Sequence, residues 1–111
     1  MARRTVPEKP RFLDAPFHPW NNQGMDLNEM LVFVEVVRAG SFTAAARSLQ
    51  MPKSSVSRKV SSLEDRLKVE LLRRTTRRVG LTDIGEDYFR TCEAIVAEAR
   101  AADRRVAEMQ A

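Results

Sequence analysis

The stretch "PKSSVSRKVSSLE", residues 52–64, places five serines in its first eleven positions. Serine is a poor residue for a helix interior because its hydroxyl competes for backbone hydrogen bonds. The stretch still has a helical period, because its apolar residues recur at every third or fourth position. These residues are Val56, Val60, Leu63 and Leu67. The pattern predicts a helix with one narrow apolar stripe.

The opposite face of this predicted helix carries Ser54, Ser57, Arg58 and Ser61. A face meant only for solvent would more usually carry Glu, Lys and Gln, which are better helix formers. Short hydroxyl side chains let a helix approach another surface closely, and the free N–H groups at a helix N-terminus favour phosphate. The pattern indicates a helix that contacts a polyanion; a serine-rich helix that is simply solvated is the alternative.

The charge of the chain gathers around the same stretch. Residues 51–82 carry nine basic and three acidic side chains, a balance of +6, against −1 for residues 25–50 and −3 for residues 83–111. Such a concentration is typical of a surface that binds a polyanion. An ordinary solvated face explains the charge alone equally well.

Two shorter helices are expected before this one. Apolar residues recur at helical spacing from Leu27 and stop at Gly40, a residue that favours helix ends. Ser41 is a good cap for a second helix, which contains alanines at 44–46. Pro52 cannot continue that helix and suits the first turn of the third.

The stretch "LLRRTTRRVGL", residues 71–81, predicts a small β-hairpin with four arginines about its turn. Thr82 is then expected to cap a last helix of about 28 residues, longer than so small a domain can cover beyond its start. Its apolar stripe follows heptad spacing, and self-pairing is the simplest way to bury the far end. The stripe consists of Tyr88, Cys92, Ile95, Ala99, Ala102, Val106 and Met109. On it, Cys92 is expected to be a packed small hydrophobe.

Three regions are therefore expected: a leader at 1–24, a domain at 25–82 with helix-turn-helix at about 42–61, and a helix at 83–111. The leader holds four of the five prolines and no periodic pattern, which predicts an extended or disordered segment. A passive tail is the favoured interpretation, and a basic arm that enters a DNA minor groove is the alternative. The basic residues of this arm are Arg3, Arg4, Lys9 and Arg11.

Composition excludes several classes of protein. A chain of 111 residues allows one modest core, and no apolar run reaches the length of a membrane span. The single cysteine, Cys92, cannot form an internal disulfide, which fits a reducing cytosol. Because the chain lacks a glycine-rich phosphate loop, a catalytic triad and a Cys/His cluster, we expect no enzyme activity, metal or cofactor.

Three stretches together resemble the LysR-type transcriptional regulators: "AGSFTAAARSL" (39–49), "SSVSRKVSSLEDRL" (54–67) and "LLRRTTRRVGLTDIG" (71–85). The resemblance continues along the following helix and covers residues 25–111. It implies a mainly α fold, a winged helix-turn-helix with a small β-hairpin wing, followed by a long dimerising linker helix. It also implies a homodimer in the bacterial cytoplasm, associated with the nucleoid, that reads an interrupted inverted repeat of double-stranded DNA through the major groove.

The resemblance also assigns roles to residues. The candidates for the major groove are Lys53, Ser54, Ser57 and Arg58. Ser41 and Thr43 would approach phosphates, as would Arg74, Thr75 and Arg77 in the wing. The Leu63-Glu64 pair is a structural signature, with Leu63 in the core.

Three departures from the family pattern matter. Lys53 stands where glutamine is frequent, and lysine suits guanine or phosphate better than adenine. Gln50 stands where a glycine is frequent, which leaves the geometry of the turn open. The family continues with an effector-sensing region, so a small-molecule effector and a higher homo-oligomer are expected only of a longer protein. The rival interpretation is a winged-helix module that binds a partner protein through the heptad helix.

Overall fold

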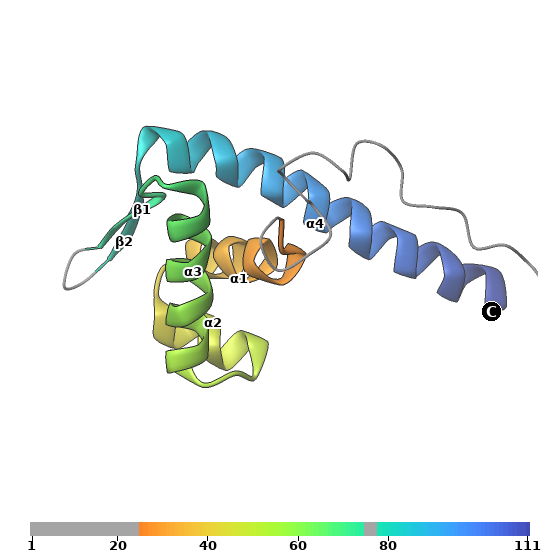
Figure 1. Cartoon of the computed structure of the whole chain (residues 1–111). Coiled ribbons are helices and arrows are strands. Elements are labelled where there is room, and N and C mark those ends of the chain that lie inside the picture. Colours follow the sequence, from red (N-terminus) through yellow and green to blue (C-terminus); the bar gives the residue numbers. More distant parts are fainter. Residues whose placement is uncertain (1–24, 75–77) are drawn as a thin grey trace, which may run out of the picture.

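The computed structural model describes residues 25–74 and 78–111. Its elements, in chain order, are α1 (Leu27–Ala39), α2 (Phe42–Leu49), α3 (Lys53–Leu67), β1 (Leu72–Arg74), β2 (Val79–Leu81) and α4 (Asp83–Gln110). Helices α1, α2 and α3 cluster together, the hairpin projects to one side, and α4 runs from the hairpin past α1 and beyond the cluster (Figure 1). The predicted winged helix-turn-helix followed by a long helix is confirmed. None of the described helices combines the length and apolar character needed to cross a bilayer.

Local capping sets the helix boundaries. The Ser41 hydroxyl accepts a hydrogen bond from the Ala44 N–H (3.0 Å), and the Thr82 hydroxyl accepts one from the Gly85 N–H (2.9 Å). Gly40 ends α1 in the left-handed region, at φ 80°. The predicted caps and the predicted stop at Gly40 are confirmed.

The turn between α2 and α3 is tight. Gln50 adopts the left-handed conformation, with φ 54° and ψ 44°, where the family often has glycine. The Met51 N–H donates to the Ala46 carbonyl (3.0 Å), which closes the turn. Pro52 lies one position before α3 rather than in its first turn, with an extended ψ of 143°. The turn therefore keeps a glycine-like conformation with a side chain in place.

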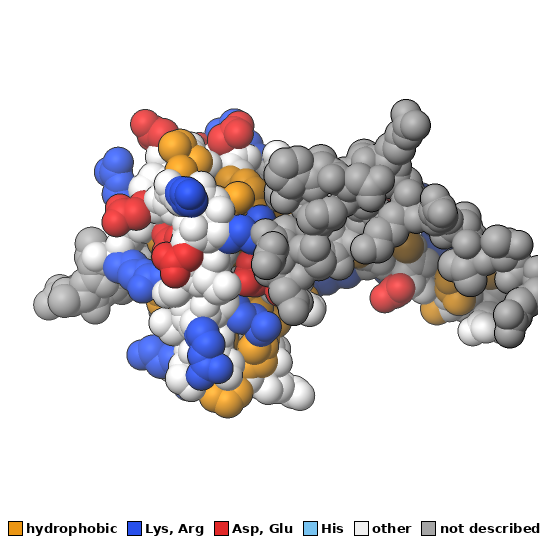
Figure 2. Space-filling view, in the orientation of Figure 1, with side chains coloured by type: hydrophobic (Ala, Val, Ile, Leu, Met, Phe, Trp, Pro, Cys, Tyr) orange, Lys and Arg blue, Asp and Glu red, His pale blue; other side chains and the backbone are white. Residues whose placement is uncertain are grey.

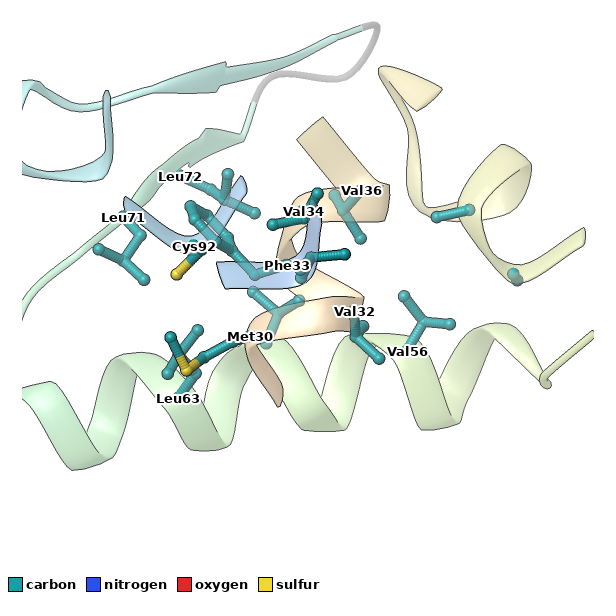
Figure 3. Close-up of a cluster of buried hydrophobic side chains, with 14 residues drawn as sticks. Met30, Val32, Phe33, Val34, Val36, Val56, Leu63, Leu71, Leu72 and Cys92 are labelled. Carbon is teal, nitrogen blue, oxygen red and sulfur yellow. The ribbon is translucent and has the colours of Figure 1, made fainter. Parts of the chain in front are cut away.

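The core lies where α1 is covered by the other elements (Figure 3). Phe33 of α1 is fully buried, and its ring meets Tyr88 and Phe89 of α4 at centroid distances of 5.8 and 6.2 Å. Opposite, α3 contributes Val56, Val60 and Leu63, all fully buried, while Leu67 is half-buried. The predicted apolar stripe of α3 is confirmed, and so is the place of Leu63 in the core.

Helix α4 begins against the backbone of Glu70 and Leu71, directly before β1. The Thr82 N–H donates to the Leu71 carbonyl (3.0 Å), and the Thr82 hydroxyl donates to the Glu70 carbonyl (2.7 Å). One turn later, a Cβ added at Gly85 would overlap the Leu71 carbonyl oxygen. Only a residue without a side chain allows this close approach. In the hairpin itself, β1 and β2 are antiparallel, with Leu72 opposite Leu81.

The first part of the heptad stripe packs on its own domain. Cys92 is fully buried in the core, and Tyr88 is half-buried. The expectation that Cys92 is a packed small hydrophobe is confirmed. The prediction that Cys92 also contacts a second copy of the chain is wrong, because its own domain buries it completely. Helical periodicity shows which residues share a stripe and does not show where the domain stops covering it. Beyond this point the stripe residues are exposed: Ile95, Ala99, Ala102, Val106 and Met109.

Gly85→Ala is expected to destabilise the domain by about 1–3 kcal/mol, the usual cost of overpacking. This clash outweighs the better helix propensity of alanine. Gly80→Ala is the matched control, because a Cβ there would meet Arg73 atoms no closer than 3.9 Å. The measurement is urea unfolding followed by circular dichroism. A Gly85→Ala variant as stable as the wild type would contradict the close packing of α4 on the Leu71 backbone.

Stability is expected to fall at alkaline pH. Burial raises the pKa of the Cys92 thiol, and burial together with the neighbouring Cys92 raises the pKa of Tyr88 to about 12. Because both acids are harder to ionise in the folded chain, their contribution to stability is complete below their ordinary pKa values and is lost as pH rises above them. The loss should begin near a pH of about 8.5, the ordinary thiol value.

The measurement is the free energy of unfolding in urea at a series of pH values from neutral upward. Cys92→Ala removes one of the two groups, so its stability should start lower and fall less steeply with pH. Parallel curves for the wild type and the variant would contradict the assignment of the alkaline loss to Cys92.

Candidate nucleic-acid interface

The exposed face of α3 carries the residues predicted to meet DNA. Lys53, Ser54 and Arg58 are exposed and Ser57 is half-buried; Ser54, Ser57 and Arg58 lie away from the buried stripe, and Lys53 is the first residue of the helix. Lys and Arg side chains lie along this side of the molecule, over α3 and the region of α2 (Figure 2). The structure therefore brings the four predicted groove-facing residues together on one helix surface.

The N-terminus of α3 is open to an anion. Its cap residue, Pro52, has no side chain that can accept a hydrogen bond, and the first turn holds no acidic residue. The Pro52 carbonyl receives the N–H groups of Ser55 and Val56. The two preceding amides have no backbone partner among the described residues. Such a helix start presents N–H groups and partial positive charge to a ligand.

The N-terminus of α2 has a similar character. The Ser41 hydroxyl oxygen is already an acceptor for the Ala44 N–H, so Ser41 serves the fold as a cap. Thr43 is exposed in the first turn, which contains no acidic residue. Both predicted phosphate-facing residues thus lie at one helix start, where partial positive charge favours anions.

Arg74 has two partners within the molecule. Its guanidinium pairs with Glu64 Oε1 (3.3 Å) and lies over the Phe42 ring, 5.1 Å from the centroid. The second oxygen of Glu64 accepts from the N–H groups of Leu71 (2.8 Å) and Leu72 (3.2 Å). Glu64 therefore fixes the start of the wing to α3, and Arg74 links the wing to α2. With 44% of its side chain exposed, Arg74 still presents a cation at the surface.

The prediction covered only part of the basic surface. Thr75 and Arg77 lie outside the described residues, so their wing contacts stay predictions. Other basic side chains were not among the predicted site residues, although the charge count of residues 51–82 already included three of them. These are Arg47, Lys59, Arg73 and Arg78, of which Lys59 is half-buried and the others are exposed.

A groove of about 290 Å³ lies between α1 and α4, and we call it the α1–α4 groove. Its apolar lining consists of Leu27, Met30 and Leu31 from α1 and Ile95, Val96 and Ala99 from α4. Leu27 is 51% exposed and was not predicted as part of any binding surface, because its spacing indicated only the apolar face of a helix. Ile95 and Ala99 belong to the predicted stripe, so the stripe and the groove form one apolar surface.

Comparison with known proteins identifies the group to which this chain belongs. Residues 27–86 match the family described as "Bacterial regulatory helix-turn-helix protein, lysR family". An HTH-type transcriptional regulator of Xanthomonas campestris pv. campestris (strain 8004) is 53% identical over 85 residues, covering 77% of this chain and 25% of that protein.

The HTH-type transcriptional activator AaeR of Escherichia coli (strain K12) is 54% identical over 72 residues, covering 65% of this chain and 23% of AaeR. Among solved structures, the complex of BenM_DBD with catB site 1 DNA aligns with a TM-score of 0.71 at 28% identity. That alignment covers 78% of this chain and 97% of BenM_DBD. The chain spans about a quarter of the length of the curated relatives it matches. It belongs to the lysR family of bacterial regulatory helix-turn-helix proteins.

Proposed function

We propose that this chain binds double-stranded DNA sequence-specifically, as the DNA-binding part of a LysR-type transcriptional regulator in the bacterial cytoplasm. The observation that carries the proposal is the polar face of α3, exposed opposite a fully buried stripe. A helix of this kind enters a major groove, about 12 Å wide, without uncovering the core. The likeness to BenM_DBD, which was solved with catB site 1 DNA, supports DNA binding.

The side chains divide into two roles. Arg58 and Lys53 suit the acceptor atoms of guanine, and Ser54 and Ser57 can hydrogen-bond either base edges or phosphates. The N-termini of α2 and α3 and the wing suit phosphates. Phosphate contacts set the position and orientation of the protein on the duplex and do not read its sequence. The phosphate-facing residues are Ser41, Thr43 and Arg74, with Thr75 and Arg77 as predicted additions.

Arg58→Ala is expected to cost about 1–3 kcal/mol of binding free energy on the preferred sequence and to weaken discrimination between bases. The preferred sequence is obtained by selection from a random duplex pool with the wild-type chain. Fluorescence anisotropy then compares that duplex with a scrambled one over a salt series. Arg90→Ala, on the exposed side of α4, is the control and should bind as the wild type does.

An equal loss on the selected and scrambled duplexes would make Arg58 a phosphate contact and contradict its role in base recognition. The salt series distinguishes this function from a protein-binding module. DNA affinity should fall steeply with salt, with a log–log slope of about −0.9 for each phosphate contact. Absence of duplex binding at low salt would contradict the proposed function.

We also propose that a second copy of the chain covers the exposed part of the α4 stripe and the α1–α4 groove. Val106 and Met109 are 58% and 85% exposed, which leaves a long apolar strip without a partner in the described chain. The small side chains of Ala99 and Ala102 allow two such helices to approach closely, and the heptad spacing favours a helical partner. A two-fold dimer presents two copies of α3 to successive major-groove faces, so its site would be an interrupted inverted repeat.

Ala99→Glu is expected to split the dimer without unfolding the domain, because Ala99 is exposed and a glutamate there puts a charge in the surface that the second copy would cover. Ala97→Glu is the matched control, since Ala97 is exposed on α4 but lies off the stripe. Analytical ultracentrifugation over a concentration series measures the effect. A wild-type chain that stays monomeric well above the concentration needed for DNA binding would contradict the dimer.

A further inference from the structure

A buried ion pair joins the end of the DNA-facing helix to the start of α1. Arg66, in the last turn of α3, lies with Nη2 at 3.5 Å from Oε1 of Glu29, in the first turn of α1. The two side chains are only 16% and 10% exposed. Arg66 Nε and Nη2 and Glu29 Oε1 make no hydrogen bond within the described part of the chain. The pair is therefore held by position and charge, without well-aligned hydrogen bonds.

Tyr88 of α4 belongs to the same cluster. Its ring packs against Phe33, and the nearby Arg66 guanidinium acts against the rise in its pKa that burial and Cys92 cause. The net result is a pKa of about 12, so Tyr88 stays neutral further into the alkaline range than an ordinary tyrosine. We call Glu29, Arg66 and Tyr88 the polar cluster. It takes one residue from each of α1, α3 and α4.

A contribution to the stability of the fold does not explain why the chain has this cluster. Removing two charges from water costs several kcal/mol for each ion, and replacing a buried pair by apolar residues is often neutral or stabilising. What a buried charge does enforce is geometry, because its partner must stay within reach as the surrounding elements pack. A set of such groups shared by three helices restricts how those helices lie relative to one another.

The cluster lies between the DNA-facing helix α3 and the helix α4 that would form the dimer, so a fixed geometry there affects DNA binding. Arg66 lies at the end of the helix whose other end carries Lys53, Ser54 and Arg58, and Tyr88 precedes the exposed part of the α4 stripe, which begins at Ile95. The angle between α3 and α4 sets where the two copies of α3 lie in a dimer. We infer that Arg66 is a positioning residue that fixes this angle and thereby selects the spacing between DNA half-sites. The inference rests on the proposed dimeric DNA binding.

The variant Glu29→Met with Arg66→Met tests it, because two apolar side chains of similar length replace the pair. The probes are fluorescent duplexes built from the half-site that the wild-type chain selects, with two copies separated by one-base-pair steps over a helical turn. The variant should bind a single half-site as the wild type does. Its discrimination between the best and worst spacing should be about 3- to 10-fold smaller.

Glu86→Met with Arg90→Met is the matched control. This pair lies within α4 at 2.8 Å, and both side chains are largely exposed. The substitutions are of the same type and remove the same charges, so the control should keep the spacing profile of the wild type.

A second measurement does not use DNA. Spin labels at Ser62→Cys on α3 and Glu98→Cys on α4, both exposed positions, report the distance between the two helices by electron paramagnetic resonance. Cys92 is fully buried, so a labelling reagent does not reach its thiol in the folded chain. The Met/Met variant should show a broader distance distribution than the wild type or the control.

A folded Met/Met variant that keeps the wild-type spacing profile would overturn the inference, whether or not its distance distribution broadens. If that variant does not fold, Arg66→Lys decides, since lysine keeps the charge but not the planar guanidinium. A flatter spacing profile for Arg66→Lys supports the inference and an unchanged profile overturns it. A wild-type chain that binds no duplex contradicts the proposed function instead, and the distance measurement then decides whether Arg66 fixes the angle.

Discussion

The burial of one apolar stripe of α3 against α1 is the constraint on which the rest of the structure depends. Three branched side chains, Val56, Val60 and Leu63, have no exposed surface. At about 2 kcal/mol for each buried side chain, this contact outweighs the weak helix propensity of the serines around it. Because the stripe is narrow, most of the circumference of α3 remains outside the core. The polar side chains there need no role in folding and are free to serve recognition.

Much of this architecture follows from sequence alone, for physical reasons that are local. Caps such as Ser41 and Thr82 and the stop at Gly40 act on hydrogen bonds within one turn of chain, so their positions can be read from neighbouring residues. The stripe of α3 needs only a regular period. Once the apolar stripe is known, the residues on the other faces of α3 are the candidates for the groove, and the structure places them close together.

Other features depend on which elements meet in space, and a one-dimensional pattern does not contain that information. Cys92 and Ile95 look equivalent on the heptad stripe, yet the domain covers the first and leaves the second exposed. Arg74 looks like a simple wing cation, although its contacts to Glu64 and Phe42 join three elements. The ion pair between Glu29 and Arg66 spans 37 positions of the chain, and neither residue carries a local signal.

The contact at Leu71 gives the wing and α4 a common joint. The Leu71 carbonyl receives the Thr82 N–H, its N–H is held by Glu64 of α3, and Gly85 lies directly against its backbone. The start of α4 and the start of the hairpin are thus anchored at the same backbone position. Because α4 also packs on α1 between this joint and its far end, a load applied to the far end reaches α1 first and the joint at Leu71 after it. The wing and the end of α3 would feel such a load together.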